Sequence, residues 1–324
     1  MATPTIPHIT ILGSLNTDLV AYVPHHPLPG ETLTATSFLT SPGGKGSNQA
    51  VACAKLSRPR SLTSPSAHVS MVGAVGSDPN GTLLLTNLTS HGVDPSLVST
   101  LPGTKTGIAM IVVEAETGQN RIIISGEANH QVDESFLTKG NWLEKTDMLI
   151  MQLEIPMGTV LKAVEEAKKR GVDVLLNPAP AKKLPGSVYE GLKHLVVNET
   201  EAAILGDVDE EELDTLEGLE RVGEKFGGMG VENFIATLGG RGVYYLTKDG
   251  KKGLVEAERG VKVVDTTGAG DTFVGRYALD AAAARKEGKE FDIEGAVKKA
   301  NKAAAVTVQR EGAAASIPWR DEVE

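Results

Sequence analysis

Short apolar runs of strand length alternate with longer amphipathic stretches along most of the chain. A short apolar run between polar turns is typical of a strand that is buried on both faces. When such strands alternate with helical stretches, the pattern indicates a parallel sheet with helices on both sides, so we predict an α/β fold. The runs expected to form strands are residues 9–13, 69–75, 148–153, 172–177, 195–198, 234–238 and 261–264.

Residues 157–170 illustrate the predicted helices. Val160, Leu161 and Val164 recur on one side, and basic residues follow in the last turn before Gly171. A second helix is expected over 272–285. Open α/β sheets bind ligands in a crevice at the carboxyl ends of their strands, so we look for a site there.

Two stretches break the alternation of strands and helices. Residues 19–40 combine prolines and turn residues with short β-branched runs, and residues 106–125 are typical of a hairpin with a polar turn at 116–119. Together they predict a small β-layer outside the main sheet. A flap over the crevice and a plain extension of the sheet edge both fit, and we favour the flap because each stretch adjoins a core strand.

Composition supports a globular protein of one large domain or two ordinary ones. The chain has 324 residues, of which 40% are hydrophobic and 23% charged, and its net charge of −10 argues against a nucleic-acid partner. The single cysteine, Cys53, lies among small residues and is expected in the core. No basic segment precedes a long apolar one, so we expect a cytoplasmic protein. The polar stretch 57–68 predicts a surface loop.

The strongest chemical signal is the segment VVDTTGAGDTF at residues 263–273. We expect a strand ending at Asp265, a turn through Gly268 and Gly270, and a helix beginning near Asp271. Amides at a helix amino terminus suit an anion, and a carboxylate there can accept a proton from an attacking hydroxyl. The alternative interpretation is structural, because Asp is also a favoured helix cap.

A second glycine-rich segment, SPGGKGSNQA, occupies residues 41–50. Its glycines would expose backbone amides before a helix, while Lys45 adds a cation and Asn48 a side chain that both donates and accepts. The spacing is not that of a Walker A loop. A flexible turn in which Ser47 caps the helix fits the sequence equally well.

Polar side chains follow several predicted strands. Asn16 and Asp18 come after the first strand, and such closely spaced polar groups suit adjacent sugar hydroxyls. Glu154 ends another strand, and the acids of segment 198–201 could orient hydrated magnesium. Each cluster alone could be a turn or a helix cap, but several at successive strand ends favour a binding site.

Other motifs argue against two classes of site, and the role of one further segment has more than one interpretation. The glycine turn at residues 237–242 suits a base, a phosphate or a hairpin. The seven histidines show no paired spacing, so a structural zinc site is not expected. Residues 13–16 lack the remaining glycines of a dinucleotide fingerprint, which argues against a nicotinamide dehydrogenase.

Taken together and in this order, the motifs resemble the ribokinase branch of the PfkB carbohydrate kinases over nearly the whole chain. The stretch TTGAGD at 266–271 is specific for the family. The resemblance implies a Rossmann-like three-layer sandwich, with residues 1–324 forming a single domain. It also implies a β-lid from about 15–41 and 104–127 that forms a homodimer contact. The implied reaction is phosphorylation of the 5-hydroxyl of D-ribose by ATP.

The same resemblance assigns roles to individual positions. Catalysis would use Asp271 as base together with Gly268, Ala269 and Gly270. The sugar would be bound by Asn16, Thr17, Asp18, Gly44, Lys45, Gly46, Ser47, Asn48, Glu154 and Asp271. The nucleotide would lie along Asn198, Thr237, Leu238, Gly239, Gly240, Arg241, Gly242, Gly270 and Asn301. Metal sites would use Glu201 for Mg²⁺, and Asp265, Thr267, Thr307, Arg310, Gly312 and Ser316 for a monovalent cation, usually K⁺.

Two departures from the family pattern and three alternatives remain. Glu127 stands where a glycine is usual, and the 57–68 stretch is longer than in common bacterial forms. Another acceptor, such as fructose, deoxyribose or a nucleoside, would use the same chemistry, although few aromatic residues are available to stack on a nucleoside base. A regulator that binds nucleotide or sugar without turnover is a second alternative, and the dehydrogenase is the third.

Overall fold

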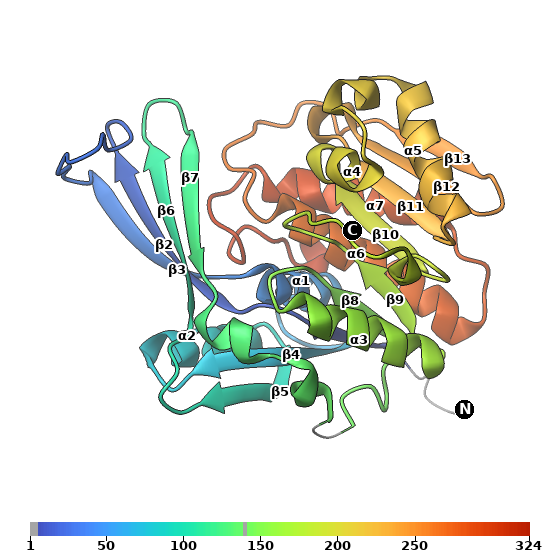
Figure 1. The fold of residues 1–324 in the computed structure, drawn as a ribbon, viewed down its shortest axis with the longest axis horizontal. Coiled ribbons are helices and arrows are strands. Elements are labelled where there is room, and N and C mark those ends of the chain that lie inside the picture. Colours follow the sequence, from blue (N-terminus) through green and yellow to red (C-terminus); the bar gives the residue numbers. More distant parts are fainter. Residues whose placement is uncertain (1–5, 139–140) are drawn as a thin grey trace.

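The computed structural model describes residues 6–138 and 141–324, and these residues form two separate sheets (Figure 1). The large sheet has nine strands in the order β13-β12-β11-β10-β9-β8-β1-β4-β5. Its strands are β1 His8–Leu12, β4 His68–Gly76, β5 Asp94–Leu101, β8 Met148–Met151, β9 Asp173–Leu176, β10 His194–Asn198, β11 Asn233–Thr237, β12 Val243–Thr247 and β13 Lys252–Val255.

Central strands of this sheet are buried on both faces, as their continuous apolar runs predict. In β8, Met148 and Ile150 belong to one hydrophobic cluster, whereas Leu149 and Met151 belong to the other. All four side chains are fully buried. Because successive side chains of a strand point to opposite faces, both faces of the sheet must be covered.

Helices cover both faces, which confirms the three-layer α/β fold. The cluster containing Met148 includes residues of α1 Lys45–Leu56, α2 Pro79–Ser90, α6 Ala269–Glu287 and α7 Ile293–Thr307. The cluster containing Leu149 includes residues of α3 Met157–Lys169, α4 Glu199–Gly206 and α5 Leu216–Gly228. Short 3₁₀ turns lie at Glu127–Gln131, Glu134–Thr138, Gly186–Val188, Glu210–Asp214, Gly239–Arg241 and Arg320–Glu322.

The prediction of a strand over 261–264 was wrong. The backbone amides of Val264 and Asp265 donate to the carbonyl of Val308 at the end of α7 instead of to a neighbouring strand. Val263 and Val264 are exposed, so nothing covers this segment as it would cover a core strand. The sheet also departs from the parallel pattern at one edge, because β12 and β13 pair antiparallel.

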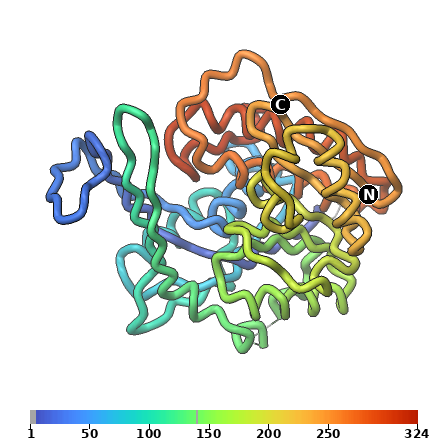
Figure 2. The backbone as a smooth tube through the Cα atoms, turned by 45° about the horizontal axis from the view of Figure 1, so that its top comes forward, coloured from blue at the N-terminus to red at the C-terminus, as the bar shows by residue number. Residues whose placement is uncertain are grey.

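The small sheet contains β3 Ser37–Gly43, β2 Asn16–Val23, β6 Gly107–Glu114 and β7 Asn120–Ser125, in that spatial order. The hairpin expected within 106–125 is formed by β6 and β7, which pair antiparallel. Its tip and the loop joining β2 to β3 project from the body of the protein (Figure 2). Asn16 and Asp18 follow β1, as predicted, but they belong to strand β2 and not to a turn, which was the alternative interpretation.

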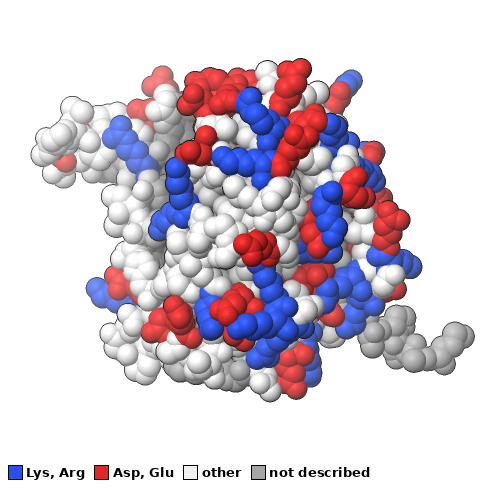
Figure 3. Space-filling view, turned by 45° about the vertical axis from the view of Figure 1, so that its right-hand side comes forward, with Lys and Arg blue, Asp and Glu red and all other residues white. Residues whose placement is uncertain are grey.

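Other features of the chain follow its composition. Cys53 is a free thiol buried in α1. Residues 57–67 of the predicted loop form no helix or strand, and β4 begins at residue 68. Basic and acidic side chains are interspersed on the face drawn in Figure 3. Among the helices of the described residues, none combines the length and the hydrophobicity needed to cross a bilayer.

Candidate active site

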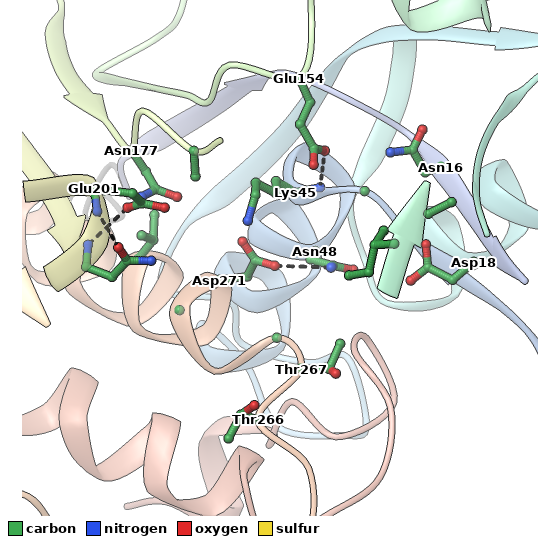
Figure 4. Close-up of a pocket in the computed structure, with 18 of the residues that line it drawn as sticks. Asn16, Asp18, Lys45, Asn48, Glu154, Asn177, Glu201, Thr266, Thr267 and Asp271 are labelled. Carbon is green, nitrogen blue, oxygen red and sulfur yellow. Dashed lines mark hydrogen bonds between the residues drawn. The ribbon is translucent and has the colours of Figure 1, made fainter. Parts of the chain in front are cut away.

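A cavity of about 390 Å³ lies where β1, β8, β9, β10 and β11 reach their carboxyl ends, beneath the small sheet (Figure 4). This is the edge of a parallel sheet at which a ligand crevice was predicted. The structure brings together residues from motifs that are more than 250 positions apart in the sequence. The predicted site residues that line the cavity are Asn16, Asp18, Gly44, Lys45, Asn48, Glu154, Asn198, Glu201, Thr237, Thr267, Gly268, Gly270 and Asp271.

A second cavity of about 380 Å³ adjoins the first, since Thr237, Thr266 and Gly270 line both. Val243, Val263 and other apolar side chains give it a more hydrophobic surface. The 237–242 turn forms the link between β11 and β12, so it is both a hairpin connection and part of this cavity wall. Predicted residues that line the second cavity are Thr237, Gly239, Gly240, Gly242, Ala269, Gly270 and Asn301.

Ten predicted site residues line neither cavity: Thr17, Gly46, Ser47, Leu238, Arg241, Asp265, Thr307, Arg310, Gly312 and Ser316. Thr17 lies between Asn16 and Asp18 on β2, and strand alternation turns it away from the cavity into the interior. Arg241 instead pairs with Glu199 and Asp214.

The two glycine-rich turns allow the backbone to come close to the cavity. Gly44 has φ +88°, and a Cβ at this position would lie 2.6 Å from the backbone nitrogen of Asn16. It is the N-cap of α1 and no side chain caps that helix, so Ser47 is not a cap. Gly268, with φ +78°, is the N-cap of α6 and packs against Ala313. The Ala269 amide donates to the Thr266 carbonyl at 3.2 Å, but no side chain caps the helix, so the amides of Gly270 and Asp271 remain available to an anion.

Asp271 lies in the first turn of α6, and the residue is only 8% exposed. It is not the helix cap, because Gly268 occupies that position. Nδ2 of Asn48 donates to Oδ2 of Asp271 at 3.1 Å, and Nε2 of Gln49 donates to Oδ1 at 3.0 Å. Burial raises the pKa of Asp271, against the opposing effects of Lys45 and these two amides.

Lys45 lies between the carboxylates of Asp271 and Glu154 in Figure 4. Burial alone would lower the pKa of its ammonium group, but the charges of Asp271, Glu154 and Glu201 outweigh burial and raise that pKa. Glu154 is itself held in place, since its Oε2 accepts from Ser14 Oγ at 2.5 Å and from the Lys45 amide at 3.0 Å. The site therefore contains a stably protonated lysine among carboxylates.

Asp18 and Asn16 project from the same face of β2 into the cavity. Burial, followed by the charges of Glu154 and Asp271, raises the pKa of Asp18 to about 7. Gly43 on the neighbouring strand leaves space for the carboxylate, because a Cβ at residue 43 would overlap it. Oδ1 of Asn16 accepts from Nδ2 of Asn129 at 2.8 Å. Asn16 is thus held by Asn129, and both side chains present polar atoms to the cavity.

Asn198 and Glu201 form a capping box at the start of α4. Oδ1 of Asn198 accepts from the Glu201 amide at 2.8 Å, while Oε2 of Glu201 accepts from the Asn198 amide at 3.0 Å. Burial raises the pKa of Glu201, against the Asn198 amide and Lys45. Asn198 and Glu201 both line the cavity, so the capping residues are also site residues.

Asp265 joins two loops beside the glycine turn of α6. Its Oδ1 accepts from the Thr267 amide at 2.9 Å and its Oδ2 from the Gly312 amide at 2.8 Å. Burial would raise the pKa of Asp265, but these hydrogen bonds, with that of the Thr267 side chain, lower it. Within residues 6–138 and 141–324, no cluster of three or more His, Cys, Asp or Glu side chains could hold a metal ion.

Sequence reasoning missed several residues of the site. Asn177 lines the cavity at the end of β9, where the strand-end rule would have found it. Gln49 and Asn129 hold Asp271 and Asn16 from behind, and their spacing in the sequence gives no sign of those contacts. Besides the polar Asn120, β6 and β7 contribute apolar side chains, which carry no chemical signal: Ala109, Ile111, Ile122 and Ile124.

Glu127 follows the small sheet and has φ +45°, a conformation that favours glycine. This explains why glycine is usual here in the family that the sequence resembles. Glu127 Oε1 accepts from Ser125 Oγ at 2.8 Å, so the side chain has a local partner.

Comparison with known proteins agrees with this architecture. The sequence pattern of the pfkB family of carbohydrate kinases matches residues 7–320. A ribokinase from Schizosaccharomyces pombe is 43% identical over 323 residues, covering 98% of this chain and 96% of the relative. A deoxyribokinase from Salmonella typhi is 36% identical over 311 residues, covering 96% and 95% of the two chains. The structure of Arabidopsis thaliana ribokinase complexed with ribose and ATP has a TM-score of 0.85 at 30% identity and covers 98% of each chain. The chain therefore belongs to the pfkB family of carbohydrate kinases.

Proposed function

We propose that this protein is a ribokinase, which transfers the γ-phosphoryl group of ATP to the 5-hydroxyl of D-ribose. Family membership makes it an ATP-dependent sugar kinase. The observation that carries the assignment of roles is the position of Asp271. This carboxylate lies at the amino terminus of α6, in a cavity that also contains Lys45 and the polar pair Asn16 and Asp18.

In the proposed reaction, Asn16, Asp18 and Asn48 bind the sugar hydroxyls so that the 5-hydroxyl faces Asp271. The 5-oxygen forms a bond to the γ-phosphorus, the bond from phosphorus to the β,γ-bridging oxygen breaks, and ADP leaves. Asp271 takes the proton of the hydroxyl. The amides at the start of α6 and the ammonium of Lys45 offset the negative charge on the moving phosphoryl group.

The adjoining cavity is the proposed site of the nucleotide. Its apolar lining suits a purine base, and it opens at Thr237 and Gly270 toward the cavity that holds Asp271. A nucleotide bound there would direct its phosphates at the amino terminus of α6. Gly239, Gly242 and Asn301 would lie beside the base and ribose of the nucleotide.

Glu201 is the side chain best suited to Mg²⁺ linked to the phosphates. Its Oε2 is used in the capping box, and the carboxylate also faces the cavity. Protein sites for Mg²⁺ commonly use one or two carboxylates with substrate phosphates and water, so a single carboxylate fits. Bound there, Mg²⁺ would offset phosphate charge.

The loops joined by Asp265 fit a monovalent cation. Asp265 is held between two adjacent loops by the Thr267 and Gly312 amides, and its lowered pKa keeps it ionised, so it would place negative charge beside a cation such as K⁺. When bound, the cation would add positive charge near the phosphoryl group. Replacing K⁺ by a large organic cation should lower the rate, and an unchanged rate would contradict this assignment.

We also propose that residues 1–324 form one kinase domain in which about 15–41 and 104–127 act as a lid. Ile111, Ile122 and Ile124 line the cavity from above. Exposed fractions of 52% for Ile122 and 49% for Ile124 leave apolar surface that a bound sugar and a closer lid would cover. Closure would exclude water from the bound ATP and so limit hydrolysis.

The outer face of the same sheet is the proposed contact of a homodimer. Phe38, Met110 and Ile123 are 63%, 44% and 63% exposed. The strand register places all three on the face that does not line the cavity. A cluster of exposed large apolar side chains is typical of an interaction surface.

Deoxyribose is the second candidate acceptor, because a deoxyribokinase is among the relatives. The two sugars differ by one hydroxyl, and Asp18 offers a second carboxylate oxygen to such a group. The test is the kcat/KM of the purified enzyme, with ATP, Mg²⁺ and K⁺, for D-ribose, 2-deoxyribose, D-fructose and adenosine. The proposal predicts the highest value for D-ribose, whereas a higher value for another acceptor, or ligand binding without any phosphate transfer, would overturn it.

A further inference from the structure

A buried set of side-chain amides reaches Asp271 from the side that is turned away from the cavity. Gln49 on α1 is fully buried and lines neither cavity. Its Nε2 donates to Oδ1 of Asp271 at 3.0 Å and to Oδ1 of Asn177 at 2.9 Å. Its Oε1 accepts from Nε2 of Gln152 at 2.6 Å, beyond the end of β8. One amide group thus connects α1, α6 and the ends of two strands.

Asp271 and Gln152 together fix which way the Gln49 amide points. The ionised carboxylate of Asp271 can only accept hydrogen bonds, so the amino group of Gln49 must face it. Oε1 of Gln49 then faces Gln152 and accepts from its Nε2. Gly13 leaves the space for this arrangement, since a Cβ at residue 13 would overlap the Gln152 side chain. If the Gln49 amide were flipped, its oxygen would face Oδ1 of Asp271 and neither atom could donate a hydrogen bond.

The amide contacts give each oxygen of the Asp271 carboxylate one N–H donor. Asn48, which lines the cavity, donates to Oδ2, and Gln49 donates to Oδ1. Hydrogen bonds from N–H groups favour the ionised form of a carboxylate and restrict its rotation. A general base must be ionised and aimed at the proton that it removes.

We propose that Gln49 is a positioning residue for phosphoryl transfer, whose amide, oriented by Gln152, keeps Asp271 ionised and directed at the acceptor hydroxyl. This inference rests on the proposed function, in which Asp271 takes the proton of that hydroxyl. Gln49 itself touches neither sugar nor nucleotide in this account.

Other charged groups around Asp271 set the background against which Gln49 acts. Lys45 on α1 is the cation that faces it, while Glu154, Glu201 on α4 and Asp18 on β2 are acids of the same cavity. Burial raises the pKa of Asp271 and Glu154 adds to this, whereas Lys45, Gln49 and Asn48 lower it. Removing the Gln49 donor should therefore raise the pKa further.

The test is the pH profile of kcat for Gln49→Met, which keeps the side-chain length but cannot donate a hydrogen bond. Loss of one hydrogen bond to a charged group should move the acid limb of the profile upward by roughly one pH unit. On that limb the kcat of Gln49→Met should be roughly tenfold below that of the wild type, and at high pH most of the difference should disappear. The KM values for ribose and for ATP should stay within about twofold of the wild type.

Two further variants make the test specific. Gln152→Met removes only the group that orients Gln49, so it should shift the acid limb in the same direction but by less. Gln131→Met makes the same substitution at an exposed position and should leave the profile unchanged. The melting temperature of each variant shows whether it folds.

An unshifted acid limb, or an equal loss of kcat at every pH, would overturn the inference. If Gln49→Met does not fold, Gln152→Met is used instead, and an unshifted acid limb or an equal loss of kcat at every pH in that variant would overturn the inference. The proposed function fails separately, because it requires wild-type protein to phosphorylate ribose and Asp271→Asn to lose that activity. An active wild type whose Gln49 variant shows no shift would contradict only the role of Gln49.

Discussion

The two walls of the cavity are built on different principles. The wall formed by the α/β core holds Glu154 and Asp271 in hydrogen bonds between elements far apart in the sequence. The small sheet carries Asn16 and Asp18 at the start of β2, but β6 and β7 present mainly apolar side chains to the cavity, among them Ile111, Ile122 and Ile124. The core wall is therefore organised for chemistry before substrate arrives, while the small sheet supplies a cover whose apolar surface is still partly exposed.

The largest expected effect comes from the core wall. Asp271→Asn keeps the size of the side chain but removes the proton acceptor, so kcat should fall roughly 10²- to 10⁴-fold, the usual range for a general base. Binding of ATP, measured by calorimetry, should change little. Asp249→Asn, at an exposed position in the β12 to β13 turn, is the control. Turnover near the wild-type value in Asp271→Asn would remove Asp271 from the mechanism.

Substitution of Asp18 tests whether the polar start of β2 binds the sugar together with the core wall. Asp18→Ala should raise the KM for ribose by roughly 10- to 100-fold, the range expected when hydrogen bonds to a charged group are lost. The KM for ATP should stay close to that of the wild type, because Asp18 lines only the first cavity. An unchanged KM for ribose would place Asp18 outside the sugar pocket.

The apolar face of the small sheet should show a different kind of defect. Ile122→Asn removes apolar surface that closure would bury, so kcat/KM for ribose should fall roughly tenfold. Release of inorganic phosphate per sugar phosphorylated should rise, because water reaches the bound ATP. Leu254→Asn, at an exposed position of β13 that lines neither cavity, is the control. An unaltered ratio of hydrolysis to transfer in Ile122→Asn would count against a role for the sheet as a lid.

The smallest expected effect is on stability and comes again from Asp18. Its folded-state pKa is raised to about 7 from an ordinary value of 3.8, so between these pH values the folded state binds more protons than the unfolded state. Stability attributable to Asp18 therefore decreases as pH rises from about 4 to 7. Asp18→Asn cannot lose a proton, so at pH 8 it should unfold at a higher temperature than the wild type.

The expected gain at pH 8 is on the order of 1–3 kcal/mol, or a few degrees in melting temperature. Near pH 4 the difference should become much smaller, because Asp18 is protonated in the folded wild type. Melting curves of both proteins at pH 4 and pH 8 check this prediction. An equal difference in melting temperature at the two pH values would show that burial of the Asp18 charge is not the cause of the difference. A variant more stable yet poorer in sugar binding would show that Asp18 is retained for function.

The sequence allowed prediction of the centre of the fold better than its edges. Strands such as β8 are buried on both faces, so their apolar runs are continuous and easily recognised. β5 and β13 lie at the sheet edges, where no position is buried, and they were not predicted, nor was β12 beside β13. The 261–264 run has the composition of a strand, but it pairs with the end of α7 rather than with a strand.

The candidate site shows the same division between local and long-range information. Glycine turns, a lysine and carboxylates at strand ends can be recognised locally, and Asp271, Lys45 and Glu154 were predicted in this way. Gln49 could not be, because its role depends on contacts with Asn177 and Gln152 more than 100 positions away. Thr17 was included because it adjoins Asn16 and Asp18, but strand alternation points it the other way.

The identity of the product tests the central claim most directly. Purified protein incubated with D-ribose, ATP, Mg²⁺ and K⁺ can be followed by phosphorus NMR, which distinguishes a phosphate on the 5-oxygen from one on any other oxygen. The account predicts ribose 5-phosphate and ADP in equal amounts, and formation of both at least about 100-fold slower with Asp271→Asn at the same concentration. Phosphate on another oxygen, or inorganic phosphate with no sugar phosphate, would contradict it.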